Sequence, residues 1–575
     1  MARQDRLSRR SDGSAGPEVG HGYGEIDADR WGGAPEITAR RTALVRAAAP
    51  EWDALLSVLM SRYPDREWAT FARFGWRETP DRLVLTLASL DGPDAGDLDA
   101  SVSHVRIQEP YTLRTALAAE RHSLAVGVIH SHPEGAWPTA SVVDDDMDAY
   151  YARYFDGFAP NRPYASLIVA RDAAGNLTGS GRVFFCGEWH RVDQFLVAAE
   201  QPGGGFPDVA IDGYRRTNTL GTAARSRVAR LATAFGDEAA ARLSRATVAV
   251  IGAGGTGSPA IEVLARAGVG HIIVVDPDHL VASNLERVHG SEAADLPRDA
   301  ESSAQRDAGT RDATSVRWAS PGLAAASEHE SRVAPFKAAV AARHVRQINP
   351  DIRVTALVGR LPQTDVLNIV CTADMVIGAT DQQHARVALS DLALRYCVPV
   401  IDTGVLLEGE DGHVTGQVIQ LTRFLPEDPC VYCRGMVNAT RVSQELMSAD
   451  ERAARRAAAA LAHAEGGEPN AYWLDEPQLL TVGYLTTTAG AMAAGYAIGW
   501  ISGRVSPPLV RLQLNMSAPV LDVTDVRSDH EPPRAGCTCR RLRGHADQGN
   551  IDAFIHAPTH WPAVQQVEAV PHRVT

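Results

Sequence analysis

The stretch from residue 247 to residue 287 constrains the fold more than any other part of the sequence. It begins with an apolar, β-branched run at 247–251, which predicts a buried parallel strand, and a helix-like pattern then extends to about residue 267. The turn between them holds four glycines: Gly252, Gly254, Gly255 and Gly257. A second apolar run ends at Asp276. Glycines let the backbone approach a phosphate at a helix N-terminus, and an acid closing the second strand suits ribose hydroxyls, so the pattern predicts a nucleotide site.

The residues after the second apolar run narrow the kind of nucleotide. Asp276-Pro-Asp278 is followed by Ser283-Asn284-Leu285-Glu286-Arg287, and a dinucleotide oxidoreductase has no need of this second acid or of the Asn/Arg pair. The stretch resembles the ThiF/MoeB-like family, which activates ubiquitin and its prokaryotic relatives. In that family GxGGxGS, DxD and SNLxR together hold ATP. The resemblance implies that Asp276 binds the ribose, that Asp278 belongs to the same site, and that Asn284 and Arg287 lie near the phosphates.

The same resemblance adds three residues to the ATP site. The family places a phosphate-binding Lys before a helix that ends in an Asn-Pro step, and Lys337 matches it; a solvated surface lysine is the alternative. The family's Mg-binding aspartate follows a buried strand and matches Asp381, although an aspartate there also suits the cap of a helix at 382–396. The family often sends an arginine to the ATP of the partner subunit. Arg227, in a predicted helix at 225–241, is assigned to that role, with a solvated arginine as the alternative.

Four of the seven cysteines form two close pairs: Cys430-x-x-Cys433 and Cys537-Thr538-Cys539. Four thiolates are the complement of a closed structural zinc site. The ThiF/MoeB-like family has such a site, usually with two C-x-x-C pairs, so the C-x-C pair here implies a tighter geometry. Disulfides are the alternative, but clustered thiols in a chain without a secretory signal more often bind metal.

A second metal pattern lies in the N-terminal half of the chain. An apolar run at 123–129 leads directly into His130-Ser131-His132, and Ser141 and Asp144 follow at the start of a predicted helix. Histidines at i and i+2 of a strand point to the same side, so both can reach one ion. Two histidines and one carboxylate leave a fourth zinc position open for water, which is the catalytic arrangement. Taken alone, Ser141-x-x-Asp144 would be interpreted as a helix capping box.

The segment from His130 to Asp144 resembles the motif of the JAMM (JAB/MPN) metallopeptidases, H-x-H followed by S-x-x-D. In that family the serine assists the oxyanion and a glutamate on an upstream strand is the general base. Glu67, at the start of a predicted strand, matches that place better than Glu78 or Glu109, since neither of these opens an apolar strand. The gap from the histidines to Ser141 is one residue longer than the commonest family spacing, and the run of aspartates at 144–146 leaves the register of the ligand open.

Length and composition set the outline of the whole protein. A chain of 575 residues exceeds a single core, and 45% hydrophobic with 22% charged residues is an ordinary globular composition. A net charge of −14 argues against binding to nucleic acid or to an anionic membrane. The N-terminus lacks the apolar segment of a secretory signal, and the apolar stretch at 486–502 is short and rich in Gly, Ala and Thr, so we expect a cytoplasmic protein without a membrane span.

The predicted fold class is α/β: a JAB/MPN-type domain followed by a Rossmann-like ThiF/MoeB domain with a mainly parallel sheet and a structural zinc site. The expected segments are a disordered tail at 1–37, the JAMM-like domain at 38–205, a linker at 206–221, the adenylation domain at 222–545 with a mobile insertion at 290–331 and a helical insertion at 439–469, and a tail at 546–575.

The two resemblances together imply a bifunctional enzyme. Its C-terminal domain would use ATP and Mg²⁺ to adenylate the C-terminal Gly of a ubiquitin-like or ThiS/MoaD-like carrier, and its zinc peptidase would process or deconjugate that carrier. A homodimer through the adenylation domain is expected, with a conjugating enzyme or a sulfurtransferase as further partner. Sulfur transfer from an activated carrier is a second interpretation. An NAD-dependent oxidoreductase explains the glycine turn but leaves Lys337, Asp381 and the cysteines idle, and a non-catalytic scaffold leaves both sets of ligands without a use.

The cysteines outside the two pairs predict how the reaction ends. Many ubiquitin-activating enzymes transfer the carrier to a cysteine after the first zinc pair, but residues 435–482 contain none. Cys186 lies in the peptidase-like domain, and Cys371 and Cys397 flank apolar strands where burial makes a thiol unreactive. We therefore expect the reaction to stop at the acyl adenylate.

Overall fold

The computed structural model describes most of both predicted domains. The described residues are 36–37, 39–101, 104–132, 138–173, 175–198, 208–211, 220–297, 334–410, 413–466, 473–474, 481–504, 510–517, 522–525, 532–549 and 552–569. The predicted disordered tail, except residues 36–37, and the predicted mobile insertion beyond residue 297 lie outside the described residues.

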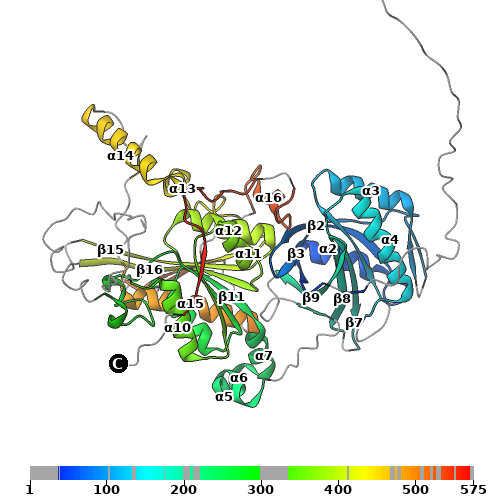
Figure 1. Ribbon diagram of the computed structural model, residues 1–575, viewed down its shortest axis with the longest axis horizontal. Coiled ribbons are helices and arrows are strands. Elements are labelled where there is room, and N and C mark those ends of the chain that lie inside the picture. The colour runs from blue at the N-terminus through cyan, green and yellow to red at the C-terminus, as the bar shows by residue number, and fades with distance from the viewer. Residues whose placement is uncertain are drawn as a thin grey trace, which may run out of the picture.

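The N-terminal domain is a closed β-barrel with helices packed against it (Figure 1). In the order of their pairing, the strands are β1 (Thr42–Ala48), β3 (Arg82–Asp91), β2 (Ala69–Glu78), β6 (Ala125–Ser131), β7 (Tyr164–Arg171), β8 (Leu177–Phe185), β10 (Asp208–Ile211) and β9 (Glu188–Ala198). The helices are α2 (Ala49–Leu59), η1 (Met60–Arg62), α3 (Glu109–Glu120) and α4 (Val142–Phe158), and β4 (Leu98–Ala100) pairs with β5 (Val105–Ile107).

Alternating residues of the barrel strands face two separate apolar clusters, as the two-residue period of a strand requires. Phe74 of β2 belongs to the cluster that receives Trp52 and Leu55 of α2. Phe71 of the same strand belongs to the cluster beneath α3 and α4, where it meets the ring of Tyr111 edge-on with 4.9 Å between centroids. The strand β6, which contains His130 and ends one residue before His132, is buried along its whole length and is thereby held from both sides.

The C-terminal domain is built on a nine-stranded sheet. Its parallel centre contains β15 (Val400–Glu410), β14 (Met375–Gly378), β11 (Thr247–Ile251), β12 (His271–Val275) and β13 (Arg353–Val358). Antiparallel strands extend both sides: β16 (His413–Phe424), β17 (Arg511–Asn515) and β18 (Asp522–Asp525) beyond β15, and β19 (Gln565–Val567) beyond β13. The predicted mainly parallel sheet is confirmed at its centre.

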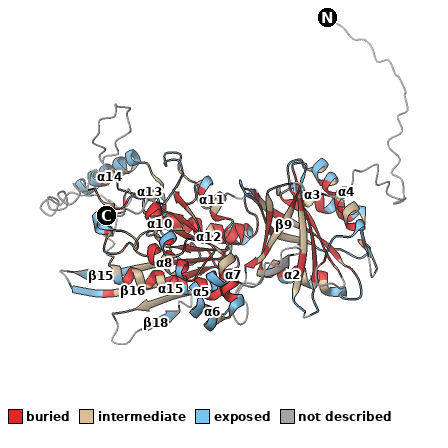
Figure 2. Ribbon diagram, turned by 60° about the horizontal axis from the view of Figure 1, so that its bottom comes forward, coloured by how far each residue is buried: buried red, intermediate tan, exposed pale blue. Residues whose placement is uncertain are grey.

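Helices cover both faces of this sheet (Figure 2). Val248 and Val250 of β11 face the cluster formed with α7 (Asp237–Arg245), α8 (Gly257–Arg266), α10 (Lys337–Ile348) and α15 (Gly483–Ser502). Ala249 and Ile251 face the opposite cluster, formed with α11 (Thr364–Val370) and α12 (Gln383–Tyr396). A strand buried on both faces explains the continuous apolar run from which it was predicted.

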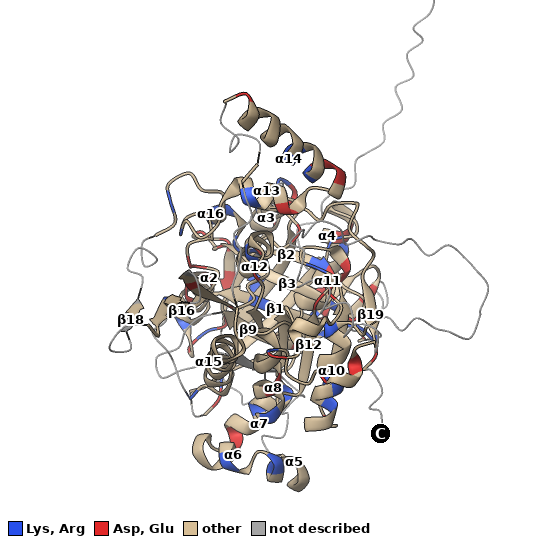
Figure 3. Ribbon diagram, turned by 90° about the vertical axis from the view of Figure 1, so that its left-hand side faces the viewer, with Lys and Arg blue, Asp and Glu red and all other residues tan. Residues whose placement is uncertain are grey.

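The remaining helices of the described residues lie at the periphery of the C-terminal domain. They are α5 (Thr222–Arg227), α6 (Ala229–Phe235), η2 (Ala282–Asn284), η3 (Ala293–Asp295), α13 (Ala439–Leu446), α14 (Ala449–Ala464) and α16 (Cys539–Leu542). Within the predicted helical insertion at 439–469, the described residues form α13 and α14. Asp450 and Glu451 lie in the first turn of α14, and its basic residues follow them along the helix (Figure 3). Among the described residues, no helix has the length and apolar character needed to cross a membrane.

The barrel and the sheet domain meet through buried polar contacts. Arg46 of β1 is 1% exposed and donates to the carbonyl oxygens of Cys371 (2.5 Å) and Ala373 (2.6 Å) at the end of α11. Thr86 Oγ1 of β3 donates to the carbonyl of Gly544 (2.7 Å), which follows α16. These carbonyl oxygens hold the two terminal nitrogens of the buried guanidinium, and losing them would leave a buried charge without hydrogen-bond partners.

Three predicted segments differ from the structure. Residues 208–211 of the predicted linker form β10, which pairs with both β8 and β9, so the barrel extends beyond residue 205. The predicted helix at 225–241 is three helices, because Val228 and Gly236 leave helical geometry and Gly236 has φ of 93°. The predicted C-terminal tail from residue 546 is also incorrect in part, since β19 adds a strand to the sheet edge through backbone hydrogen bonding that its polar sequence does not reveal.

Candidate functional site

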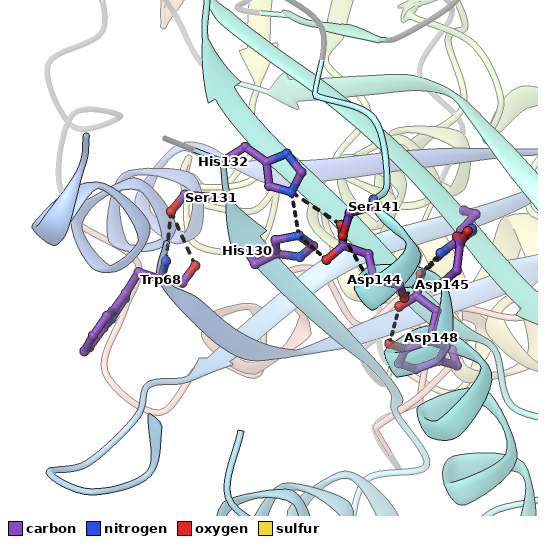
Figure 4. A network of polar contacts seen from close by, with 10 residues as sticks. Trp68, His130, Ser131, His132, Ser141, Asp144, Asp145 and Asp148 are labelled. Atoms are coloured by element: carbon purple, nitrogen blue, oxygen red, sulfur yellow. Dashed lines mark hydrogen bonds and ion pairs between the residues drawn. The ribbon is translucent and has the colours of Figure 1, made fainter. Parts of the chain in front are cut away.

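The predicted metal ligands His130, His132 and Asp144 converge at the end of β6 and the start of α4 (Figure 4). The two Nε2 atoms are 3.2 Å apart, and Asp144 places one carboxylate oxygen 3.2 Å from His130 Nε2 and the other 3.5 Å from His132 Nε2. A tetrahedral zinc ion with bonds of about 2.0–2.1 Å separates its nitrogen and oxygen ligands by roughly 3.3–3.4 Å. The spacing and the donor types therefore fit zinc, with His130 fully buried and His132 half-buried.

Glu67 lies opposite His132 where the pairing of β2 with β6 continues past the strand ends. Trp68 N donates to Ser131 Oγ (3.1 Å) and Ser131 N donates to the carbonyl of Trp68 (2.9 Å), which fixes this register. Burial raises the pKa of Glu67, while the neighbouring His132 and His130 lower it. A carboxyl group with a raised pKa beside the metal ligands has the properties of a general acid–base.

The two other glutamates considered for this place lie elsewhere. Glu78 is at the opposite end of β2, where its exposed carboxylate pairs with Arg41 at 2.6 Å. Glu109 is exposed in the first turn of α3. Of these three glutamates, Glu67 has the electrostatic interactions with both histidines.

Ser141 and Asp144 form a capping box at the start of α4, and the same Asp144 carboxylate lies beside the two histidines. Ser141 Oγ accepts from the backbone N–H of Asp144 (3.2 Å), and an Asp144 carboxylate oxygen accepts from the backbone N–H of Ser141 (2.7 Å). The cap thus aims the carboxylate at the histidines. Arg182 settles the register of the aspartate run, because it pairs with Asp145 (2.7 Å) and Asp148 (2.6 Å) and leaves Asp144 to face the site.

The four paired cysteines come together although more than a hundred residues separate the pairs. Cys430 Sγ lies 3.8 Å from Cys537 Sγ, and Cys433 Sγ lies 3.9 Å from Cys539 Sγ. The two sulfurs of a disulfide are about 2.05 Å apart, whereas a tetrahedral zinc ion with Zn–S bonds of about 2.3 Å holds its sulfur ligands about 3.8 Å apart. A hydrogen bond from Cys539 lowers the pKa of Cys430 to about 5, so one thiolate is already favoured in this cluster. The arrangement fits a closed structural zinc site.

We expect the double replacement Cys430→Ser and Cys433→Ser to remove one zinc ion per chain and to lower the thermal unfolding midpoint of the C-terminal domain by roughly 10 °C. The reason is that binding of a structural metal contributes several kcal/mol to folding. Metal analysis and calorimetry measure both effects. Cys186→Ser, an exposed cysteine of the barrel, is the matched control and should change neither. Unchanged zinc content in the double variant would remove the metal from this cluster.

The predicted nucleotide residues surround one cavity of about 540 Å³ at the carboxyl ends of the parallel strands. The predicted residues that line it are Gly252, Gly254, Gly255, Asp276, Asp278, Asn284, Arg287, Lys337 and Asp381. The carboxyl edge of an open α/β sheet is where such folds bind ligands. Residues from four separate loops therefore share one site, as a nucleotide requires.

Two glycines make the turn between β11 and α8 possible. Gly252 has φ of 98°, and a side chain there would lie 2.4 Å from the carbonyl oxygen of Ala379. A side chain on Gly257 would lie 1.8 Å from the carbonyl oxygen of Gly252. The turn is thus pressed against the loop after β14, and Gly254, Gly255 and Thr256, just before α8, line the cavity.

Asp276 is held rigidly at the end of β12. One carboxylate oxygen accepts from the backbone N–H of Ala253 (2.7 Å) and the other from that of Asp278 (2.9 Å). Burial raises the pKa of Asp276 to about 6, and Lys337 opposes the shift. Lys337 Nζ lies 3.0 Å from an Asp278 carboxylate oxygen, so these two predicted site residues form an ion pair at the cavity.

Asn284 and Arg287 reach the same cavity from the turn around η2. Asn284 is 6% exposed, and its Oδ1 accepts from the backbone N–H of Val281 (3.2 Å), which fixes the amide. The stem of Arg287 packs over Gly255, where a Cβ would lie 2.9 Å from Arg287 Cδ. The guanidinium consequently lies above the glycine turn, where phosphate groups are expected.

Asp381 is exposed at the end of β14 and does not cap the following helix. The N-cap of α12 is Gln382, without a side-chain cap. Instead Glu445 of α13 accepts from the backbone N–H groups of Gln383 (3.1 Å) and His384 (2.8 Å). The capping alternative for Asp381 is therefore not realised, and its carboxylate faces the cavity.

Arg227 does not line the cavity of its own chain. It lies in α5 and pairs with Asp351 at the end of α10. The sequence did not identify Arg360 and His384, which line the cavity from the turn after β13 and from α12. Neither residue belongs to a motif with fixed spacing, so only the packing of the chain brings them to the site.

The ThiF family model matches residues 226–308 and 328–539, which together make up more than half of the chain. SAMP-activating enzyme E1 of Haloferax volcanii is 30% identical over 200 residues, covering 34% of this chain and 56% of that protein. Sulfur carrier protein adenylyltransferase of Thermus thermophilus is 29% identical over 168 residues, covering 29% of this chain and 48% of that protein. The chain thus spans about half the length of these two relatives. A structure of MccB in complex with N-formylated MccA matches with 16% identity and a TM-score of 0.38, covering 54% of this chain and 74% of that one.

Proposed function

This chain belongs to the ThiF family, and on that premise we propose that its C-terminal domain uses ATP to adenylate the C-terminal glycine of a small carrier protein. The observation that carries the proposal is the convergence of the glycine turn, Asp276, Arg287, Lys337 and Asp381 on one cavity. A hydride-transfer enzyme would need the glycine turn and the ribose acid, but it would have no use for a lysine, an arginine and a second acid at the phosphate end.

In this proposal, different residues of the cavity bind the ribose, the phosphates and the magnesium ion of Mg·ATP. Asp276 accepts hydrogen bonds from the ribose hydroxyls, and Asn284 donates from its amide nitrogen. Lys337 leaves Asp278 for the phosphates, and Arg287 binds beside it. Asp381 and Asp278 supply carboxylate oxygens for the Mg²⁺ that accompanies ATP. A carboxylate oxygen of the carrier attacks the α-phosphorus, the bond to the bridging oxygen breaks, and pyrophosphate leaves.

Exchange of labelled pyrophosphate into ATP tests this step directly. A small carrier protein that ends in Gly should support exchange, and the same protein with that Gly deleted should not. Exchange that needs no carrier, or that ignores the terminal Gly, would contradict the proposal.

For the barrel domain we propose zinc-dependent hydrolysis of a peptide or isopeptide bond at the carrier's C-terminus. His130, His132 and Asp144 would hold the ion, which when bound supplies a Lewis acid and a water of lowered pKa. Glu67 would accept the proton of the attacking water and return it to the leaving amine. The hydroxyl of Ser141 uses its oxygen to cap α4 and keeps its hydrogen for the oxyanion.

The carrier is the partner common to both domains in this proposal. Because the barrel and the sheet domain share buried contacts through Arg46 and Thr86, we propose that one chain both activates and releases the same carrier. The names of the similar proteins include a SAMP-activating enzyme E1 and a sulfur carrier protein adenylyltransferase. A conjugating enzyme or a sulfurtransferase would receive the adenylate, and a homodimer would bring Arg227 to the partner's ATP.

The unpaired cysteines favour direct transfer of the adenylate to an outside nucleophile. Cys371 and Cys397 are both fully buried, and burial raises the pKa of each to about 12. Neither forms a thiolate near neutral pH. We expect intact-mass analysis after reaction with ATP and carrier to show no thioester between enzyme and carrier. A thioester that disappears in Cys371→Ala or Cys397→Ala would show that one of these thiols is reached.

A further inference from the structure

The C-terminal segment from residue 552 to residue 569, here called the C-terminal strap, folds back against the rim of the nucleotide cavity. It lies beyond the residues matched by the family model. Its strand β19 pairs antiparallel with β13, with Val567 opposite Ala356 and Gln565 opposite Val358. The strap is thereby attached to the strand that leads directly into the cavity wall at Gly359 and Arg360.

A set of close contacts fixes that wall to the strap. Gln363 uses both ends of its amide: its Oε1 accepts from the backbone N–H of Arg360 (2.7 Å), and its Nε2 donates to the carbonyl of Pro562 (2.7 Å). Val564 packs so closely on Gly359 that a Cβ at the glycine would lie 3.1 Å from Val564 Cγ2. The turn that lines the cavity is thus held from behind by the strap.

Trp561 joins this wall to a second one. The Arg360 guanidinium carbon lies 5.7 Å from the centre of the Trp561 ring, within the range of a cation–π contact. The His384 ring lies against Trp561 with 5.2 Å between ring centres. His384 begins α12, lines the cavity, and has its Nδ1 3.0 Å from a Glu445 carboxylate oxygen. One side chain therefore sets the separation between two cavity residues that come from different loops.

The position of this wall relative to Asp276 indicates which part of the ligand it meets. The backbone N–H of Asp276 donates to the carbonyl of Leu357 (3.0 Å), so the end of β13 lies directly beside the ribose acid. The two residues assigned to the phosphates lie elsewhere in the cavity: Arg287 packs over the glycine turn, and Lys337 is the first residue of α10. We infer that Trp561 is a positioning residue that holds Arg360 and His384 in place at the base end of the nucleotide site. This inference rests on the proposed binding of ATP.

Titration of the full-length protein with Mg·ATP and with Mg·tripolyphosphate tests the inference. In Trp561→Ala, the affinity for ATP should fall about tenfold, because the variant loses the contacts that hold both Arg360 and His384. The affinity for tripolyphosphate, which lacks the base and ribose, should not change. Trp561→Phe should restore most of the ATP affinity, and His560→Ala, an exposed neighbour on the strap, should behave as wild type.

The outcomes separate the strap from the proposed function. Failure of the wild-type chain to bind ATP would overturn the proposed function itself. Equal ATP affinity in wild type and Trp561→Ala, or an equal loss for ATP and tripolyphosphate, would overturn the role of Trp561. If circular dichroism shows that Trp561→Ala is unfolded, Gln363→Ala decides, since it releases both Arg360 and Pro562. It should weaken ATP binding and spare tripolyphosphate, and ATP affinity equal to that of wild type would refute the inference.

Discussion

In the variant Asp381→Ala, carrier-dependent exchange of pyrophosphate into ATP should fall on the order of 100-fold or more while the protein remains folded. Asp381 is exposed at the cavity and takes no part in capping α12, so its removal leaves the helix start intact on Glu445. The rate should fall because the variant lacks the carboxylate that is proposed to bind the magnesium ion, which neutralises the phosphates during adenylation. Initial rates at saturating carrier, with a thermal melt of the same preparation, measure both parts of the expectation.

Asp450→Ala is the matched control for Asp381. Asp450 is an equally exposed aspartate in the first turn of α14 and does not line the cavity. It should leave the exchange rate unchanged. If the exchange rate of Asp381→Ala equals that of this control, Asp381 has no part in the mechanism and is an ordinary solvent-exposed loop residue.

The second large effect is expected in the barrel. Glu67→Gln should retain zinc and reduce cleavage by about 100- to 10,000-fold, since it keeps the shape of the side chain and removes the group that moves protons. The double variant His130→Ala and His132→Ala should instead lose one zinc ion per chain together with all cleavage. Zinc is counted by elemental analysis, and cleavage is followed by mass on a carrier extended by a few residues beyond its glycine.

The two other glutamates give sharp controls for this assignment. The variants Glu78→Gln and Glu109→Gln should cleave the carrier at the wild-type rate, because both carboxylates lie away from the histidines. Glu78 pairs with Arg41, and Glu109 is exposed on α3. For the histidines, His463→Ala on α14 should keep all zinc. Full cleavage by Glu67→Gln, or wild-type zinc content in the double histidine variant, would refute the assigned site.

The nucleotide site was predictable because its parts are local in the sequence. A strand buried on both faces shows itself as a continuous apolar run, and Gly252 and Gly257 are required by a backbone approach that no side chain permits. The strand predicted at 247–251 accordingly has the same bounds as β11. The convergence of His130 and His132 was predictable for a related reason, since residues at i and i+2 of an extended segment point to the same side.

Features that depend on distant pairing were not predictable. In the sequence, Arg46 is an isolated charge within an apolar strand. Its carbonyl acceptors lie more than three hundred residues further along the chain. The strand β19 has the sequence Gln-Gln-Val, which carries no apolar alternation, because an edge strand is held by backbone hydrogen bonds. Trp561 follows the same pattern, since its partners Arg360 and His384 belong to no motif.

Calorimetric titration of the intact chain with Mg·ATP and with NAD⁺ tests the central claim most directly. The cavity that joins the glycine turn, Asp276, Lys337 and Asp381 should bind one ATP per chain. Binding should weaken by about tenfold or more in Lys337→Ala, because the lysine contributes a point charge to the phosphates. NAD⁺ should give no heat of binding. Saturable binding of NAD⁺ in place of ATP would contradict the account and identify the fold as that of a dinucleotide enzyme.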